Sequence, residues 1–409
     1  MKKYIIFTHT IYNLGGGQLL TLRKKKILES LGYDLFVVYK KKRGPFLLER
    51  EYNKINNLYV PEFDSPLNVI PSSRMNRSIE NVLNFIGPVT QDSIIESNDR
   101  TTAVWAEIVA QKLHIRHIYY LIIETDLNSY KFYPYNSFFD FKLKRKELWA
   151  CNSKGLEISF KKKLPYYSDV YINVPYETSE IAEISEPKID YGNWKENDKI
   201  VITTISRLDK SYVIDLFKAV CNICDRHRNY NIELNIVGDT VVGNNKQWLK
   251  EHIELLSSST PNMNVIMPGY IKSIGKDIFN HTHIFVGMGT AIISAISQGC
   301  VSLTVNPYTS LSSGILGVDT FNFAFNDNGQ EYSLEDKIEE VLKMDRDILK
   351  DKIIKFYQDN YTLEAYIRKY QMLLENCEGH LEFYDFSKRK KYKIFDKLVN
   401  WLICIKSKI

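Results

Sequence analysis

Two stretches of the sequence carry groups suited to holding phosphate. Arg207 and Lys210 follow the apolar run KIVITTI. A guanidinium offers a planar fork of N–H donors that matches phosphate oxygens, and an ammonium adds a point charge beside it. The second stretch is GMGT, Gly287 to Thr290, which joins an apolar run to a helical one. Backbone amides of Gly289 and Thr290 at such a helix start would form an uncharged anion site.

Each feature also has an ordinary structural explanation. Arg207 is compatible with a surface arginine at a strand end, and GMGT with a tight strand-to-helix connection. The early glycines GGGQ, Gly15 to Gln18, are compatible with a plain turn, since a lone glycine cluster is weak evidence. Their joint occurrence at strand ends favours a binding site. The helical stretch TAIISAISQG has no charged residue in a chain that is 25% charged, and these motifs do not explain why.

Polar side chains in the first half also follow apolar runs. They are His9, Asn98, Asp99, Glu124 and Asp126. Carboxylates and imidazoles at the lip of a cleft are where a general base would be needed, and His9 and Glu124 are the preferred catalytic candidates. The alternative is that these residues start turns or cap helices, above all Asp99 in NDRTTAVW.

Strand and helix patterns alternate along most of the chain. Glycine turns between them predict right-handed βαβ units and parallel sheets. We expect an α/β protein with two doubly wound, Rossmann-like domains that face each other across a cleft, at residues 1–176 and 199–376. Residues 177–198 read as a polar linker, and residues 377–409 as a basic amphipathic tail. In such sheets ligands bind beyond the carboxyl ends of the strands, which puts the site in the cleft.

Composition excludes several classes of protein. The 409 residues are too many for one ordinary core, and 44% hydrophobic content excludes a disordered chain. No apolar run reaches the length needed to span a bilayer, and MKKYIIFTHT is interpreted as a first strand rather than a signal peptide. Cys221 and Cys224 form a lone CxxC within a helical pattern, which indicates core thiols rather than a metal site. Six cysteines without framework spacing favour the cytoplasm.

The order of motifs resembles the GT-B glycosyltransferases, particularly the retaining group often called family 4. SRLDK stands where that group has GRL followed by lysines, NIVGDT matches a strand ending in glycine and aspartate, NVIMPGYI matches a further glycine segment, and GGGQ matches the early glycine turn. The resemblance implies a nucleotide-sugar donor, with Arg207 and Lys210 stabilising its leaving diphosphate. Implied donor-binding residues are Gly16, Gly17, Gly238, Asp239, Gly287, Met288, Gly289, Thr290 and Ser294.

The sequence departs from the family pattern at two glutamates. Aligning GMGT with the family's E-G-F-G turn puts Val286 and Ser294 at the glutamate positions, and Tyr212 replaces a second lysine. One interpretation is an active hexosyltransferase with other sugar and ribose contacts, including the Ser294 hydroxyl. Its outcome would be retaining, with the leaving phosphate taking the proton and without a metal ion or other cofactor. The alternative is a catalytically silent partner or scaffold for another transferase.

The C-terminal tail combines charge with an apolar run. Residues 387–409 hold eight Lys or Arg against one acid, Asp396, together with LVNWLICI. Such a segment lies at an anionic membrane surface, so we expect a cytoplasmic, peripherally membrane-bound enzyme that acts on a saccharide acceptor, lipid-linked, in surface-polysaccharide synthesis. The alternative is a solvated basic face and a packed terminal helix. Nucleic acid is not expected, because no binding module accompanies the charge.

Overall fold

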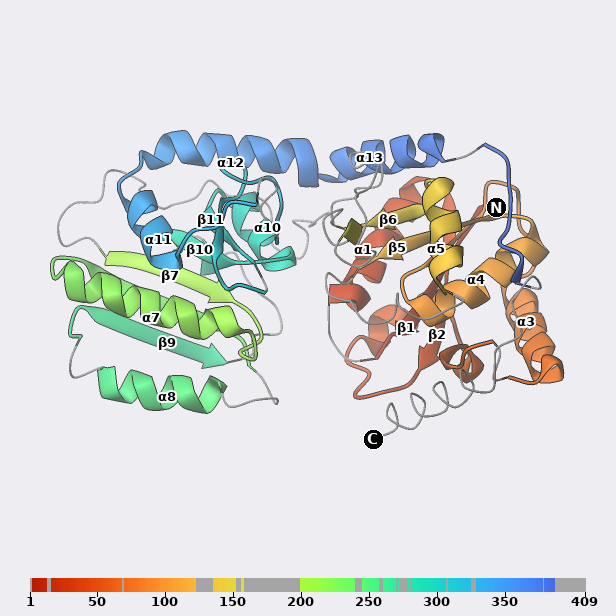
Figure 1. Ribbon diagram of the computed structural model, residues 1–409, viewed down its shortest axis with the longest axis horizontal. Coiled ribbons are helices and arrows are strands. Elements are labelled where there is room, and N and C mark those ends of the chain that lie inside the picture. Colours follow the sequence, from red (N-terminus) through yellow and green to blue (C-terminus); the bar gives the residue numbers. More distant parts are fainter. Residues whose placement is uncertain are drawn as a thin grey trace.

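Two α/β domains lie side by side in the computed structural model (Figure 1). The structure describes residues 2–12, 16–67, 70–122, 135–151, 156–157, 199–239, 245–256, 260–269, 271, 278–279, 281–306, 308–324, 329–377 and 379–386. Three expectations lie outside these residues: the linker 177–198, the basic tail 387–409 and the candidate Glu124 with Asp126 nearby.

The first domain is built on a parallel sheet with strand order β3-β2-β1-β4-β5-β6. Its strands are β1 Lys2–Thr10, β2 Tyr33–Lys41, β3 Asn56–Tyr59, β4 Ile94–Ser97, β5 Arg116–Leu121 and β6 Leu148–Ala150. Its helices are α1 Gly16–Ser30, α2 Glu49–Tyr52, α3 Ser72–Ile86, α4 Arg100–Leu113 and α5 Tyr135–Lys144, with a 3-10 turn at Pro61–Asp64. The central strands are buried on both faces, which explains why they read as continuous apolar runs.

The second domain repeats this plan in the order β12-β11-β10-β7-β8-β9. Its strands are β7 Lys199–Ile205, β8 Asn231–Val237, β9 Met263–Gly269, β10 Ile284–Gly287, β11 Val301–Val305 and β12 Ser312–Ile315. Only β12 runs antiparallel among the described strands, at the edge beside β11. The helices are α7 Ser211–Arg226, α8 Asn245–Leu256, α10 Thr290–Ser297, α11 Leu334–Leu342 and α12 Arg346–Tyr361. Two doubly wound domains are thus confirmed.

The last of the described helices, α13 Leu363–Asn376, leaves the second domain and packs on the first (Figure 1). Its Tyr370 ring lies 6.2 Å from the Tyr4 ring on β1 and 5.7 Å from the Trp149 ring on β6, measured between centroids. The segment that follows continues along this domain, where the amide of Tyr384 donates to Glu107 at 2.8 Å. The predicted boundary at residue 376 therefore differs from the packing, since helical periodicity does not say which sheet an apolar face will cover.

The packing of helix α10 explains why it has no charged residue. It packs between strands β10 and β11 on one side and α12 on the other. Residues 292–297 are all buried, so no face of this stretch reaches water. A charged side chain here would have to be desolvated without a partner, at a cost of several kcal/mol.

Candidate active site

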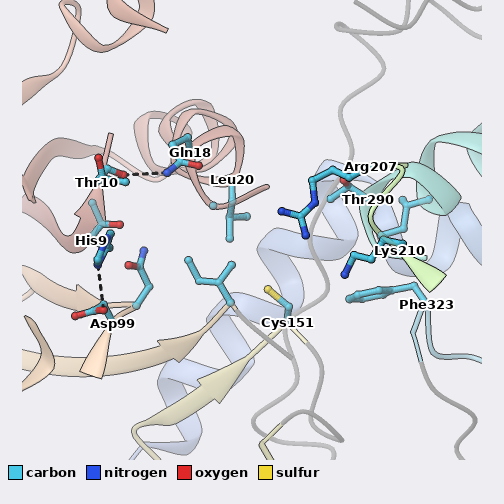
Figure 2. Close-up of a pocket in the computed structure, with 16 residues that line it drawn as sticks. His9, Thr10, Gln18, Leu20, Asp99, Cys151, Arg207, Lys210, Thr290 and Phe323 are labelled. Atoms are coloured by element: carbon cyan, nitrogen blue, oxygen red, sulfur yellow. Dashed lines mark hydrogen bonds and ion pairs between the residues drawn. The ribbon is translucent and has the colours of Figure 1, made fainter. Parts of the chain in front are cut away.

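A cavity of about 640 Å³ opens between the two domains, at the carboxyl ends of β1, β4 and β7 and at the start of α10 (Figure 2). Its polar first-domain lining is Thr8, His9, Thr10, Gln18, Asn98 and Asp99, and its second-domain lining is Arg207, Lys210, Gly289, Thr290, Ile293 and Phe323. Arg207 and the GMGT turn, far apart in sequence, therefore meet at one surface. The dimensions suit a small-molecule ligand.

Arg207 and Lys210 form a cationic wall after strand β7. The Arg207 side chain is 71% exposed, and its guanidinium lies 3.2 Å from the Asp209 carboxylate. Lys210 precedes the first residue of α7 with an extended backbone and lines the same cavity. Both side chains reach toward the first domain (Figure 2). Two cations at the rim of a cavity attract an anionic ligand through their summed field.

The start of α10 supplies amides beside this wall, but not the pair expected from sequence. Gly289 takes a positive φ of 67° and precedes the helix without a side-chain cap. Its own N–H donates to the Phe323 carbonyl at 3.0 Å, so it is not free for a ligand. An anion at this helix end would be met by the first-turn amides from Thr290 onward.

Gly238 and Asp239 are not among the described residues that line the cavity. Gly238 has φ of 139°, and a Cβ atom there would lie 1.8 Å from the Ser206 carbonyl oxygen. The glycine therefore lets the chain approach Ser206 closely at the ends of β7 and β8, and its role in donor binding stays a prediction. The Asp239 carboxylate accepts from Lys246 Nζ at 2.7 and 2.8 Å.

Three further predicted donor residues are also not among the described residues that line the cavity. Gly287 ends β10, where a Cβ atom would meet the Phe285 ring at 2.8 Å. Met288 packs against the hydrophobic core. Ser294 is 3% exposed, and its hydroxyl donates to the Thr290 carbonyl one turn earlier at 2.9 Å. The expected ribose contact of Ser294 has no support in this geometry, because a serine on the buried face of α10 bonds within its own helix.

Two residues that the sequence analysis aligned with a glutamate and a lysine of the family pattern lie in the core. Val286 is fully buried on β10, and Tyr212 is 2% exposed on α7. Burial raises the pKa of the Tyr212 hydroxyl, while bonds from Ser206 and Thr204 oppose that rise. Neither side chain reaches the cavity, so a different set of groups must contact any sugar bound there.

The first-domain wall is organised around His9 and Asp99. Asp99 caps α4, accepting from the amides of Thr101 and Thr102 at 3.1 Å, as the alternative explanation anticipated. The same carboxylate lies 2.9 Å from Lys40 Nζ and 3.6 Å from His9 Nδ1. Burial opposes its ionisation, but Lys40, His9 and the amide of Thr102 together hold the pKa of Asp99 well below its usual range. An ionised carboxylate thus faces the imidazole.

The glycine turn of the first domain leads into α1. Gly16 is the first residue of this helix, and Gly17 lines the cavity. Gln18 donates from its side-chain amide to the Thr10 carbonyl at 3.1 Å, which ties α1 to the end of β1 (Figure 2). The early turn and the β7 end therefore contribute to opposite walls of one cavity.

Sequence reasoning missed the apolar part of the lining. These residues are Leu20, Ile122, Cys151, Ile293 and Phe323. Two of them follow a predicted residue at helical spacing, Leu20 after Gly17 and Ile293 after Thr290, and that spacing would have found them. Cys151 and Phe323 reach the cavity only through the fold. Within the described residues no group of three or more His, Cys, Asp or Glu is placed to hold a metal ion.

Solved structures with similar folds place this arrangement in a known architecture. HepE from Anabaena, in complex with UDP, superposes with a TM-score of 0.61 at 13% identity, over 92% of this chain and 100% of HepE. The chain has the GT-B fold. A glycosyltransferase from Rickettsia africae matches at TM-score 0.61 and 16% identity, over 92% of this chain and 98% of its own.

Other GT-B neighbours were solved with sugar ligands. A variant of TarM from S. aureus, in complex with fondaparinux, alpha-GlcNAc-glycerol and UDP, matches at TM-score 0.58 and 12% identity, over 91% of this chain and 99% of TarM. No protein-family model and no curated protein sequence matches this chain. None of the described helices of this GT-B chain has both the length and the apolar character for crossing a membrane.

Proposed function

We propose that this protein is a glycosyltransferase that moves a sugar from a nucleotide-sugar donor to a saccharide acceptor. One observation carries the proposal: a cationic wall of Arg207, Lys210 and the α10 start faces the His9–Asp99 pair across a single interdomain cavity. The GT-B neighbours solved with UDP support a nucleotide in that cavity.

The second domain holds the donor diphosphate. Arg207 and Lys210 contact its oxygens, and the first-turn amides of α10 donate hydrogen bonds to the remaining oxygens. As the sugar bond breaks, negative charge grows on the leaving diphosphate, and these fixed donors stabilise it most when it is largest. Because the site already carries this positive charge, transfer proceeds without a metal ion or other cofactor, and chelation with EDTA leaves the rate unchanged.

The first domain positions the acceptor. His9 hydrogen-bonds a reacting hydroxyl, and the ionised Asp99 orients the ring. We propose a retaining reaction, on the basis of the resemblance to the family 4 group. An oxygen of the leaving phosphate takes the acceptor proton as the new bond forms. Glu124 stays a candidate for acceptor contact, outside the described residues.

The acceptor is lipid-linked, and the enzyme works at the cytoplasmic membrane face in surface-polysaccharide synthesis. The basic run at Lys388–Lys391, with LVNWLICI after it, supports this assignment. Sedimentation with phosphatidylglycerol vesicles tests it. Full-length protein should pellet with the vesicles, and a variant with these four residues changed to Gln should stay in solution. Equal pelleting of both would remove the tail from the proposal.

A panel of UDP- and GDP-sugars tests the main assignment. Thermal shift detects binding, because a ligand of the folded state raises its stability with occupancy. Donor hydrolysis and transfer to saccharide acceptors follow for each ligand that binds. Binding with turnover supports an enzyme. Binding without any turnover supports the silent-partner alternative, and no binding across the panel rejects a nucleotide-sugar site.

A further inference from the structure

A strip of apolar residues lines part of the cavity. It consists of Leu20, Ile122 and Cys151 from the first domain with Ile293 and Phe323 from the second. Leu20, Cys151, Ile293 and Phe323 are nearly fully buried, and Ile122 is half-buried. Figure 2 draws Leu20 and Cys151 in the space between the His9–Asp99 pair and the Arg207–Lys210 wall. Apolar side chains therefore line part of the cavity between the Arg207–Lys210 wall and the His9–Asp99 pair.

Local geometry holds the strip in place. Leu20 stands three residues after Gly17 on α1, and Ile293 three residues after Thr290 on α10, so each shares a helix face with a cavity residue. A Cβ atom at Gly17 would lie 3.8 Å from Ile122 Cδ1, which puts Ile122 against the start of α1. The backbone bond from Gly289 to Phe323 fixes the second-domain end.

Carboxylates, the usual acceptors for sugar hydroxyls, are scarce beside the strip. The described second-domain lining contains none, and that of the first domain contains Asp99 alone. Asp99 is occupied by Lys40, the two α4 amides and His9. A hydroxyl pressed against Leu, Ile and Phe would lose water without gaining a partner, whereas a methyl group there gains by burial.

A sugar joined to a diphosphate at Arg207 and meeting an acceptor at His9 has to lie across this strip. Building on the proposed function, we propose that the donor sugar carries a methyl group against the strip. The methyl belongs to a 6-deoxy carbon or to an acetamido substituent. Ile122 and Ile293 are then specificity-determining residues that select for it.

Matched donors that share a nucleotide test this selection. The pairs are UDP-glucose with UDP-6-deoxyglucose, UDP-glucose with UDP-N-acetylglucosamine, and GDP-mannose with GDP-6-deoxymannose. Dissociation constants of the full-length protein for each ligand, and for UDP and GDP alone, come from calorimetry or competition. At least one methyl-bearing donor should bind about 10-fold tighter than its parent. The deoxy and acetamido arms separate the two sources of the methyl.

Substitution of Ile122 ties the preference to the strip. Ile122→Thr removes the terminal Cδ1 and adds a hydroxyl. Ile122→Val has the shape of threonine but stays apolar, so it is the matched control. The ratio of affinities within a pair should fall at least about threefold in Ile122→Thr and persist in Ile122→Val. Because the ratio is internal to each variant, a general loss of affinity cancels, and thermal unfolding of each variant confirms that it is folded.

The outcomes separate the two levels of the proposal. Parent sugars that bind as tightly as their methyl-bearing partners, or a preference that survives Ile122→Thr, overturn methyl selection and leave the transferase assignment standing. Failure of UDP, GDP and every donor to bind overturns the nucleotide-sugar site itself, and methyl selection falls with it.

Discussion

The Nδ1 atom of His9 lies 3.6 Å from a carboxylate oxygen of Asp99. His9 is near the end of β1, and Asp99 follows β4, the strand that pairs with β1 in the sheet. Because parallel neighbours end at the same edge, two residues 90 positions apart become partners. The carboxylate also caps α4 and pairs with Lys40, so it is fixed before any ligand arrives. The imidazole is thereby oriented from one side, and none of the described residues is recorded as a partner of its Nε2 atom.

His9→Ala should lower the transfer rate by about 10²-fold, because the reacting hydroxyl loses its hydrogen-bonding partner. The His9 side chain is 43% exposed, so thermal unfolding should change little. Initial rates at saturating donor measure the effect, and His9→Asn serves as a conservative control. A variant rate within twofold of the parent would remove His9 from the chemistry.

Proton NMR of the product reports the anomeric configuration, and an inverted product would contradict retention.

Arg207→Ala should weaken UDP or GDP binding by about 10- to 100-fold, because a charge-assisted pair with the diphosphate is lost. Stability should stay within about 0.5 kcal/mol, since the side chain is largely exposed. Arg207→Lys keeps the charge but loses the forked pair of N–H donors. Its affinity for the nucleotide should lie between that of the parent and that of Arg207→Ala. Calorimetry with the diphosphates and with the plain nucleosides checks this. Equal losses for nucleoside and diphosphate would show that Arg207 does not act through phosphate.

Gly238→Ala should destabilise the fold by at least about 3 kcal/mol, because the new methyl group would overlap the Ser206 carbonyl. Gly269→Ala is the matched control. Gly269 also has a positive φ, 79°. Among the described residues, its chain neighbours aside, no atom lies within 4 Å of its Cβ position, so only backbone strain of about 1–2 kcal/mol is expected. Urea unfolding measures both. Similar losses for the two variants would contradict the close approach of β7 and β8.

The buried His117 should make stability fall as the pH drops. His117 Nδ1 lies 2.7 Å from Glu107 and Nε2 lies 2.8 Å from Ser97, a pattern that suits a neutral ring donating to the carboxylate. Burial, and then the Lys142 ammonium, lower the pKa of His117 to about 4. The unfolded chain therefore takes up this proton first, near pH 6.5. Between that pH and about pH 4, proton binding stabilises the unfolded state relative to the folded state.

Between pH 7 and pH 5 this single group should remove about 2 kcal/mol of stability. Glu107 has a pKa lowered to about 2, despite burial, by Lys142 and His117, so it does not titrate in the folded state within this window. Urea unfolding at both pH values, for the parent and for His117→Gln, isolates the effect as a difference. The variant should lose about 2 kcal/mol less on acidification. An identical pH dependence for both proteins would contradict a neutral His117.

Much of the architecture followed from local pattern in the sequence. Buried parallel strands must be apolar along their whole length, and the segments around β1, β4, β7 and β10 show that pattern with turns after them. Right-handed connections then bring strand ends to one edge, which is why His9, Arg207, Lys210 and the GMGT turn could be assigned to a common cavity from residue order.

Tertiary packing decided what each residue at those ends does. The sequence predicted Gly238 and Ser294 as ligand contacts. The carbonyl of Ser206, just after β7, fills the space beside Gly238, and the Thr290 carbonyl accepts from the Ser294 hydroxyl. Phe323 and Cys151 enter the cavity from segments with no local signal. Sequence by itself thus determined the order of strands and helices, because periodicity and turn chemistry are short-range. Which surface a side chain meets depends on how the segments pack against one another, and only the folded chain sets that packing.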